Sequence, residues 1–344
     1  MKILSVRHAV PSSILSNEDI VARIIAASGP SLSADALSAM VARVRQFLDR
    51  VGTRTRHATD GREAAIDILR QAVDRALAAA RITPADLDFI IYAGVNRGWL
   101  EPSSAALVQR EYAATNAVCF DIMEACASWL RAIQVAQAFF HSGTYRLGMI
   151  VNCECALEHL ATYDLATAKD PEAAFAGFTI GEAATATIVS KFDDGDLYVT
   201  MRSLGEYCDL CMIPLANAGS YLKTYDPAAH PPGRFYSQSK ALFQTTIQHL
   251  VDAYRGDAVL QQRQHDIYFS HAASAHAGEK TREVLNIPAE RWYCTHSRFG
   301  NTVAASVPLG MSAAIDDGRL RRGMKALVGV GSAGISIGLA SFTF

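Results

Sequence analysis

The sequence predicts an α/β fold made of two similar halves, each with a mostly parallel sheet covered by helices. Apolar segments of strand length alternate with longer segments in which apolar residues recur every three or four positions. Half of the 344 residues are apolar, which is enough for a sizeable core and about two domain-sized units. An internal repeat, described below, relates the two units to each other.

Expected strands and helices alternate through the first half of the chain. The expected strands are 2–9, 88–94, 117–120 and 147–153, and the expected helices are 17–27, 33–48, 63–81, 103–112 and 126–140. Residues 88–94 are a continuous apolar run, which is typical of a strand buried on both faces. Arg50, Arg54 and Arg56 follow the second helix, either as a solvated turn or as a clamp for a phosphorylated ligand.

The alternation resumes in the second half after two irregular segments. Residues 154–180 are irregular, and residues 205–235 are rich in proline and glycine and form a long insertion, a feature that is often functional. The expected helices are 237–254, 275–285 and 301–315, and the expected strands are 266–270, 325–330 and 335–343, with one further strand after residues 181–186.

One stretch of the sequence recurs at a fixed distance. Residues 143–149 return as 318–324 with both glycines, the arginine and the methionine in matching places, an offset of 318 − 143 = 175. The same offset relates Cys126 to Asn301, since 301 − 126 = 175. We therefore predict two halves, residues 1–175 with the cysteine and residues 176–344 with His271 and Asn301, packed so that their equivalent helix starts meet at one site.

Composition and charge exclude several classes of function. The formal net charge is −2, so we expect no surface for nucleic acid or for membrane lipid. No apolar run approaches the roughly 18 residues of a membrane span and the N-terminus has no signal-peptide pattern, so we expect a cytoplasmic protein. Seven scattered cysteines indicate reduced thiols, and the Cys208–Cys211 spacing lacks a second pair, so no metal site is expected.

Cys126 is the candidate nucleophile. The apolar run 117–120 ends just before it, and a helical pattern follows it, so we expect Cys126 among the first residues of a helix. Unpaired backbone N–H groups and the positive end of the helix dipole favour a thiolate at such a position. The sequence therefore predicts a depressed pKa for the Cys126 thiol and a nucleophilic role.

His271 and Asn301 are the candidate partners of this cysteine. His271 ends a buried strand, where α/β folds present catalytic groups, and Asn301 begins the helix related to that of Cys126. A neutral imidazole and a carboxamide are both hydrogen-bond donors. Together they can hold a thioester carbonyl while negative charge develops on its oxygen.

The motifs around these residues resemble the ketoacyl synthase III branch of the thiolase superfamily. The resemblance runs essentially end to end and is strongest in Ala125-Cys126-Ala127, in His271 after its strand, and in Gly300-Asn301-Thr302-Val303-Ala304-Ala305-Ser306-Val307-Pro308. It implies the five-layered thiolase fold, a homodimer and a Cys–His–Asn site. It also implies that an acyl thioester of coenzyme A or of an acyl carrier protein loads the cysteine, without any other cofactor.

Further matches imply substrate contacts. Arg50 matches the arginine that contacts the CoA nucleotide, whereas the neighbouring tryptophan of the family is Gln46 here. Gly331-Ser332-Ala333-Gly334 matches the glycine-rich oxyanion turn, which makes Ala333 a candidate for substrate binding. In place of the family's His-Gln-Ala-Asn, the chain has His271-Ala272-Ala273-Ser274, so Ser274 stands where the family has a second asparagine.

Glu101 and Ser274 instead resemble the olefin-pathway condensing enzymes and the pyrone-forming ketosynthases, which join two acyl thioesters without losing CO₂. In these relatives a glutamate that reaches across the dimer serves as the base, and Leu100-Glu101-Pro102-Ser103 matches their motif. Glu101 is either this base or an acid favoured by the nearby helix start. The implied function is a Claisen-type condensation to a 3-oxoacyl product, in secondary metabolism.

Two other functions stay open. Relatives in antibiotic pathways transfer the acyl group to a hydroxyl or amine of a small-molecule acceptor, and Asn96, Arg97 and the 205–235 loop suit a polar acceptor of this kind. Some dimers of this family also contain a catalytically inactive subunit. The complete set of Cys126, His271 and Asn301 argues against that alternative.

Overall fold

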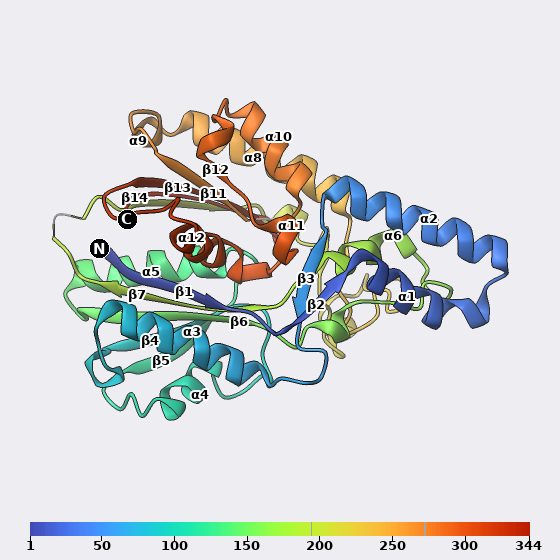
Figure 1. The fold of residues 1–344 in the computed structure, drawn as a ribbon, viewed down its shortest axis with the longest axis horizontal. Helices are drawn as coiled ribbons and strands as arrows, with labels where there is room; N and C mark the ends of the chain where they lie inside the picture. The colour runs from blue at the N-terminus through green and yellow to red at the C-terminus, as the bar shows by residue number, and fades with distance from the viewer. Residues whose placement is uncertain (194, 272) are drawn as a thin grey trace.

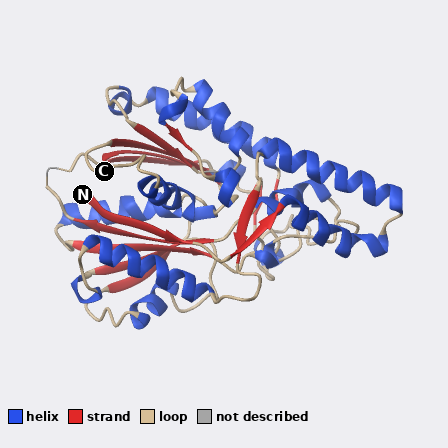
Figure 2. Ribbon diagram, viewed as in Figure 1, coloured by secondary structure: helices blue, strands red, loops and turns tan. Residues whose placement is uncertain are grey.

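The protein is built from five layers, with two sheets alternating with three layers of helices (Figure 1). The structure is a computed structural model that describes residues 1–193, 195–271 and 273–344. Both large sheets lie on either side of a central helical layer, which Figure 2 shows between two sets of strands. The five-layered α/β fold predicted from the sequence is therefore confirmed.

The two large sheets have the same topology. The first has the order β5 (Val118–Ile122), β4 (Phe89–Ala93), β6 (Leu147–Glu154), β7 (Ala183–Ser190), β1 (Lys2–Ala9), and the second has the order β12 (Trp292–Tyr293), β11 (Ile267–Ser270), β13 (Lys325–Ser332), β14 (Ser336–Thr343), β8 (Tyr198–Ser203). In each sheet the first three strands are parallel, and the last two join antiparallel. The duplication read from the sequence is thus visible in the strand order.

The border between the halves lies further along the chain than predicted. β7 pairs with both β6 and β1, so residues 183–190 complete the first sheet. A division at 175/176 would separate this strand from its partners. The border therefore falls between β7 and β8, because the chain must return to the first sheet after the irregular segment 155–180 before it enters the second.

Helices fill the three remaining layers. The central pair is α5 (Ser128–Ser142) and α12 (Ser306–Asp316), the first sheet is covered by α3 (Ala65–Ala80) and α4 (Ser104–Glu111), and the second by α8 (Ser239–Gly256), α9 (Ala258–Gln261) and α10 (Ala275–Val284). One core cluster contains residues of both sheets and both central helices, including Phe89, Trp129, Met311 and Phe342. Packing there is close, since a Cβ on Gly338 of β14 would meet Leu130 of α5 at 2.6 Å.

The remaining elements extend from one end of the layers (Figure 1). They are α1 (Asn17–Ser28), α2 (Ala34–Val51), the antiparallel pair β2 (Ser13–Ser16) and β3 (Thr55–Ala58), α6 (Pro171–Ala174) and α11 (His296–Phe299). The 205–235 insertion carries β9 (Cys211–Met212) and α7 (Ala218–Tyr221), and β9 pairs with β10 (Tyr236–Ser237). Throughout the described part of the chain, no helix combines the length and the apolar character that crossing a membrane requires.

Candidate active site

Cys126 lies in the turn between β5 and α5. The N-cap of α5 is Ala127, so Cys126 precedes the helix instead of lying within its first residues, as the sequence had suggested. Ala125 has a φ of +46°, which turns the chain sharply before the cysteine. The Ser128 hydroxyl donates to the Ala125 carbonyl at 2.7 Å and accepts from the Glu124 N–H at 2.8 Å, which fixes this turn.

The pKa of the Cys126 thiol is raised, whereas the sequence predicted a depressed value. Burial is the main cause, because it removes water from the thiolate, and the nearby Cys211 and Glu154 add electrostatic repulsion. A hydrogen bond from the Ser332 side chain acts in the opposite direction and lowers the thiol pKa. Desolvation, with smaller contributions from these two neighbours, therefore outweighs the helix start, and the thiol is protonated near neutral pH.

His271 directly follows β11 and carries a neutral ring. Its backbone N–H donates to the Gly329 carbonyl of β13 at 3.1 Å, which continues the pairing of these parallel strands. Burial lowers the pKa of His271 to about 4, and the neighbouring His296 contributes to this decrease. Its buried Nδ1 has no hydrogen-bond partner among the described residues. The imidazole can therefore accept a proton near neutral pH.

Asn301 is buried at a turn that matches the turn of Cys126. Gly300 precedes it with a φ of +69°, and the offset of 175 relates Gly300 to Ala125, whose φ is also positive. The Asn301 backbone bridges to Ile180, and its Oδ1 accepts the Val303 N–H at 3.0 Å. This bond leaves the carboxamide Nδ2 as a donor that no described residue uses.

Two side chains connect the three segments, although none of the recorded hydrogen bonds between described residues joins Cys126, His271 and Asn301 directly. The Ser332 Oγ, at the end of β13 beside the His271 strand, accepts the Ala127 N–H at 3.2 Å. The buried Glu154 carboxylate accepts the backbone N–H groups of Val95 and Asn96, and the backbone of Ala304, three residues after Asn301, acts to lower its pKa. The carboxyl ends of strands from both sheets thus meet around Cys126.

Sequence reasoning missed Glu154 and Cys211 as parts of this site, and it placed Ser332 in the oxyanion turn without predicting its bonds to the Cys126 turn. Glu154 had a readable signal, since an acidic residue ending an apolar strand must find buried donors. Its pKa is raised to about 7 by burial, against the effect of its backbone N–H donors. Cys211 lies on β9 of the insertion, and its pKa is raised to about 12 by burial. Among the residues that the structure describes, no acidic, His or Cys group is arranged to hold a metal ion.

The remaining predicted residues are Glu101, Arg50, Ser274 and Ala333, and none of them has a recorded bond to Cys126, His271 or Asn301. Glu101 is exposed in the loop before α4, and Arg50 is exposed in the last turn of α2; neither has a recorded hydrogen bond or ion pair to a described residue. Ser274 caps α10 by accepting the Ala277 N–H at 3.1 Å and donates to the Val51 carbonyl at 3.2 Å, which places the end of α2 beside the segment after His271. Ala333 lies half-buried in the turn after β13. Ala272, part of the predicted motif, lies outside the described residues.

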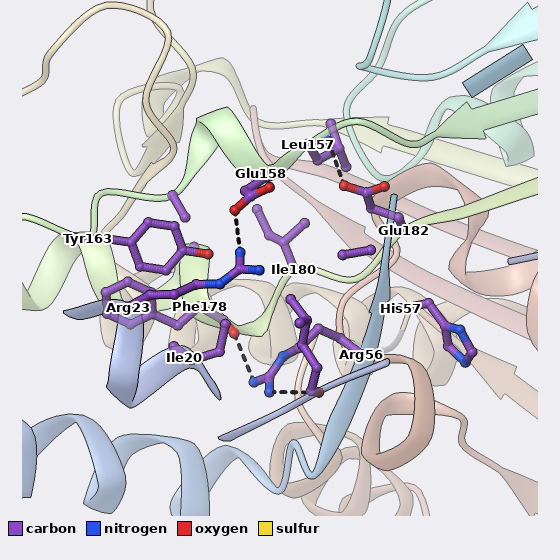
Figure 3. Close-up of a pocket in the computed structure, with 14 residues that line it drawn as sticks. Ile20, Arg23, Arg56, His57, Leu157, Glu158, Tyr163, Phe178, Ile180 and Glu182 are labelled. Carbon is purple, nitrogen blue, oxygen red and sulfur yellow. Dashed lines mark hydrogen bonds and ion pairs between the residues drawn. The ribbon is translucent and has the colours of Figure 1, made fainter. Parts of the chain in front are cut away.

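The predicted clamp of three arginines does not form. Arg56 is only 1% exposed, and its guanidinium donates to the Phe178 carbonyl at 2.9 Å (Figure 3). Arg56 lines a cavity of about 20 Å³, which has room for about one water molecule. Arg23, Glu158 and Tyr163 also line this cavity. This cavity includes neither Cys126, His271 nor Asn301, so Arg56 holds β2 and β3 to the interior and is not available to a ligand beside Arg50.

Comparisons with known proteins agree with this geometry. Residues 257–344 match the family described as 3-oxoacyl-[acyl-carrier-protein] synthase III C terminal. The chain is 28% identical to the β-ketoacyl-[acyl-carrier-protein] synthase III of Sphingopyxis alaskensis over 80% of this chain and 83% of that protein. It is 28% identical to the enzyme of the same name from Methylococcus capsulatus, over 86% and 88%.

Solved structures share the fold over the whole chain. The 3-oxoacyl-[acyl-carrier-protein] synthase III of Aquifex aeolicus superposes with a TM-score of 0.81 at 22% identity, covering 100% of this chain and 99% of that one. OleA of Xanthomonas campestris superposes with a TM-score of 0.82 at 20% identity, covering 99% and 97%. At these identities the structures show that the architecture is shared.

Proposed function

We propose that this relative of the ketoacyl synthases III, in the thiolase superfamily, loads an acyl group from acyl-CoA or an acyl carrier protein onto Cys126 and transfers it to a carbon nucleophile. The predicted resemblance, fold and acyltransferase class are confirmed by the comparisons. The reaction we propose is a Claisen-type condensation to a 3-oxoacyl product, in secondary metabolism. The observation that supports it is the half-buried Cys126 turn, whose Ala127 N–H binds Ser332 at the end of β13, the strand beside that of His271.

Loading begins from a neutral thiol and a neutral imidazole. Because burial raises the pKa of Cys126 and lowers that of His271 to about 4, neither group is charged near neutral pH. His271 accepts the thiol proton as the sulfur attacks the carbonyl carbon of the thioester. The bond from that carbon to the donor sulfur then breaks, and the departing thiolate takes the proton from the imidazolium. Loading therefore consumes and releases no net proton.

Condensation uses the donors that loading leaves in place. The Asn301 Nδ2 and the imidazole hold the carbonyl oxygen of the second thioester while a base removes its α-proton. The resulting carbanion attacks the acyl carbon on Cys126, the carbon–sulfur bond to the enzyme breaks, and the sulfur recovers a proton. Glu101 of a partner subunit is our candidate for the base, because the Glu101 side chain is exposed and not used within its own chain.

A homodimer would bring such a glutamate to the site. β5, whose end leads to Cys126, is an edge strand of the first sheet. Val118 at its start, Met123 just after it and Leu100 beside Glu101 are exposed by 45%, 65% and 78%. Unpaired strand edges with exposed apolar side chains favour pairing with another chain. This edge supports the proposal that two copies associate through β5.

Transfer to a hydroxyl or amine is the alternative, and the structure lends it less support. Asn96 was expected to meet a polar acceptor, but its backbone N–H binds Glu154 and its side-chain amide binds the Cys155 carbonyl. Arg97 donates to the Gly94 carbonyl and lies 3.8 Å from Asp121. Both side chains are therefore engaged within the loop and not presented to a ligand.

Intact-mass analysis after incubation with a panel of acyl-CoAs tests the loading step. The parent protein should gain the mass of one acyl group, and Cys126→Ala should gain none. Cys208→Ala is the matched control, because Cys208 is exposed and should leave the adduct unchanged. An adduct that persists in Cys126→Ala, or that maps to another cysteine, would end the proposal.

Product analysis with Glu101→Gln separates the two functions. This change keeps the shape of the side chain but removes its basicity, so condensation should fall by roughly 10²-fold or more while Cys126 acylation persists. The assays offer pairs of acyl thioesters, malonyl thioester, and amine or alcohol acceptors. Full condensation activity in the variant would remove Glu101 as base, and acylation of an amine or alcohol instead of carbon would favour the alternative.

A further inference from the structure

Ser332 touches the Cys126 turn on both sides of the nucleophile. Its Oγ donates to the Glu124 carbonyl at 3.1 Å and accepts the Ala127 N–H at 3.2 Å. These two backbone groups belong to residues two before and one after Cys126. Cys126 is one of the two residues between them, and the Ser332 side chain acts to lower the pKa of its thiol. A single hydroxyl of the second half of the chain therefore holds the turn that carries the nucleophile of the first half.

The hydroxyl has one proton and two acceptors for it. While Cys126 is a neutral thiol, its sulfur is a weak acceptor, and the Glu124 carbonyl is the better partner for that proton. Once the sulfur is negatively charged the order reverses, because hydrogen bonds to ionised acceptors are roughly twice as strong. The Ala127 N–H is shared between the Glu124 carbonyl at 2.9 Å and the Ser332 Oγ at 3.2 Å, so it can hold the Ser332 oxygen in both states while the hydroxyl hydrogen rotates.

We propose that Ser332 is a catalytic residue whose hydroxyl proton turns from the Glu124 carbonyl to the Cys126 sulfur when the thiolate forms. The inference rests on the proposed role of Cys126 as nucleophile. It adds a side-chain donor for the sulfur itself, distinct from the donors that hold the carbonyl oxygen of a substrate. The same donor stabilises the sulfur when it leaves as a thiolate at the end of condensation.

The surroundings of the turn make this donor necessary and keep it in place. The other groups that face the sulfur, Cys211 from β9 and Glu154 from β6, both oppose its ionisation. Glu124 carries a charge close by, but Arg131 pairs with it at 2.5 Å and the Ser336 hydroxyl donates to it at 2.8 Å. Among the described residues, Ser332 is the side chain that acts to lower the thiol pKa, whereas the Ser336 hydroxyl binds the Glu124 carboxylate.

The pH dependence of Cys126 alkylation by iodoacetamide, followed by peptide mapping, tests the inference. Ser332→Ala should raise the pH midpoint of the reaction by about one unit and slow alkylation at a fixed pH below it by roughly tenfold. Ser332→Gly should show the same rise, and Ser332→Thr, which keeps a hydroxyl, should retain the parent midpoint. Ser336→Ala is the matched control, since it removes a neighbouring hydroxyl that binds the Glu124 carboxylate and should not move the midpoint.

Two outcomes would overturn the inference. One is a midpoint that is unchanged in both Ser332→Ala and Ser332→Gly. The other is an equal rise in Ser336→Ala, which would show that the effect is not specific to the Ser332 hydroxyl. Alkylation measures the thiol whether or not it accepts acyl groups, so a failure here is distinguishable from a failure of acyl loading in the mass assay.

Discussion

Replacing Glu154 by glutamine should change how the stability of the protein depends on pH. Glu154 is completely buried at the end of β6, and its two oxygens accept the N–H groups of Val95 at 2.9 Å and Asn96 at 3.1 Å. The absence of a side chain on Gly94 permits this approach, since a Cβ there would lie 2.8 Å from Glu154 Oε1. Glutamine has nearly the same shape but never ionises.

The magnitude follows from the pKa of the carboxyl, which burial raises from 4.5 to about 7. Because the folded value lies above the unfolded value, the unfolded chain loses this proton first. The free energy of unfolding therefore falls as pH rises from about 4.5 to 7. At about 1.4 kcal/mol per pH unit, the loss is roughly 3 kcal/mol above pH 7. Glu154→Gln lacks this loss, so its stability relative to the parent should rise by that amount across the same window.

Urea unfolding of both proteins at several pH values between 4.5 and 8 measures this difference, and the titration of all other groups cancels between them. A constant offset is also expected, because glutamine has one acceptor oxygen and loses a hydrogen bond worth about 1–3 kcal/mol. Glu182→Gln at a single pH calibrates that offset, since Glu182 is another buried carboxylate that accepts backbone N–H groups. A stability of Glu154→Gln relative to the parent that stays constant or falls between pH 4.5 and 8 would refute the reasoning.

Four further predictions concern the site and its turns. In the parent, alkylation of Cys126 should keep accelerating from pH 7 to 10, because its thiol pKa is raised; a plateau near pH 7 would contradict this. The pH profile of kcat/KM should lack an inflection near 6.5 from His271, whose imidazole is neutral down to about pH 4. Asn301→Ala should lower product formation by roughly 10²–10³-fold while some acylation persists, and a decrease within about threefold would remove its role. Gly300→Ala should lower the Tm markedly, because the new Cβ would meet the Thr179 carbonyl at 2.4 Å and φ is +69°.

The architecture could be predicted because local patterns and the internal repeat agree. The apolar run of β4 and the periodic helix of α3 lie close to their expected bounds. The offset that related Cys126 to Asn301 also relates two residues with positive φ, Ala125 and Gly300, although only one of them is glycine. A repeat in sequence thus identified equivalent backbone turns before any contact was known.

The electrostatics of the site could not be predicted, because they arise from contacts between distant segments. The rule that a helix start favours a thiolate considers only the residues next to Cys126. Its acidic neighbours come from β6 and from β9 of the insertion, where residues 205–235 have no readable periodicity. Likewise, nothing in the sequence near Arg56 indicates that Phe178 accepts its hydrogen bond, so a buried arginine resembled a member of a surface clamp.

The central pair of helices has a consequence for the autonomy of the two halves. α5 and α12 lie between the sheets, and residues such as Ile133 and Val328 belong to one apolar cluster that both halves supply. Expressed alone, either half would leave the inner face of its sheet and helix in water, at about 25 cal/mol per Å² of apolar surface. Although the sequence is a tandem of two related units, neither is an independent folding domain. The whole chain should unfold in one cooperative transition, and a nick between β7 and β8 should leave two fragments that stay associated.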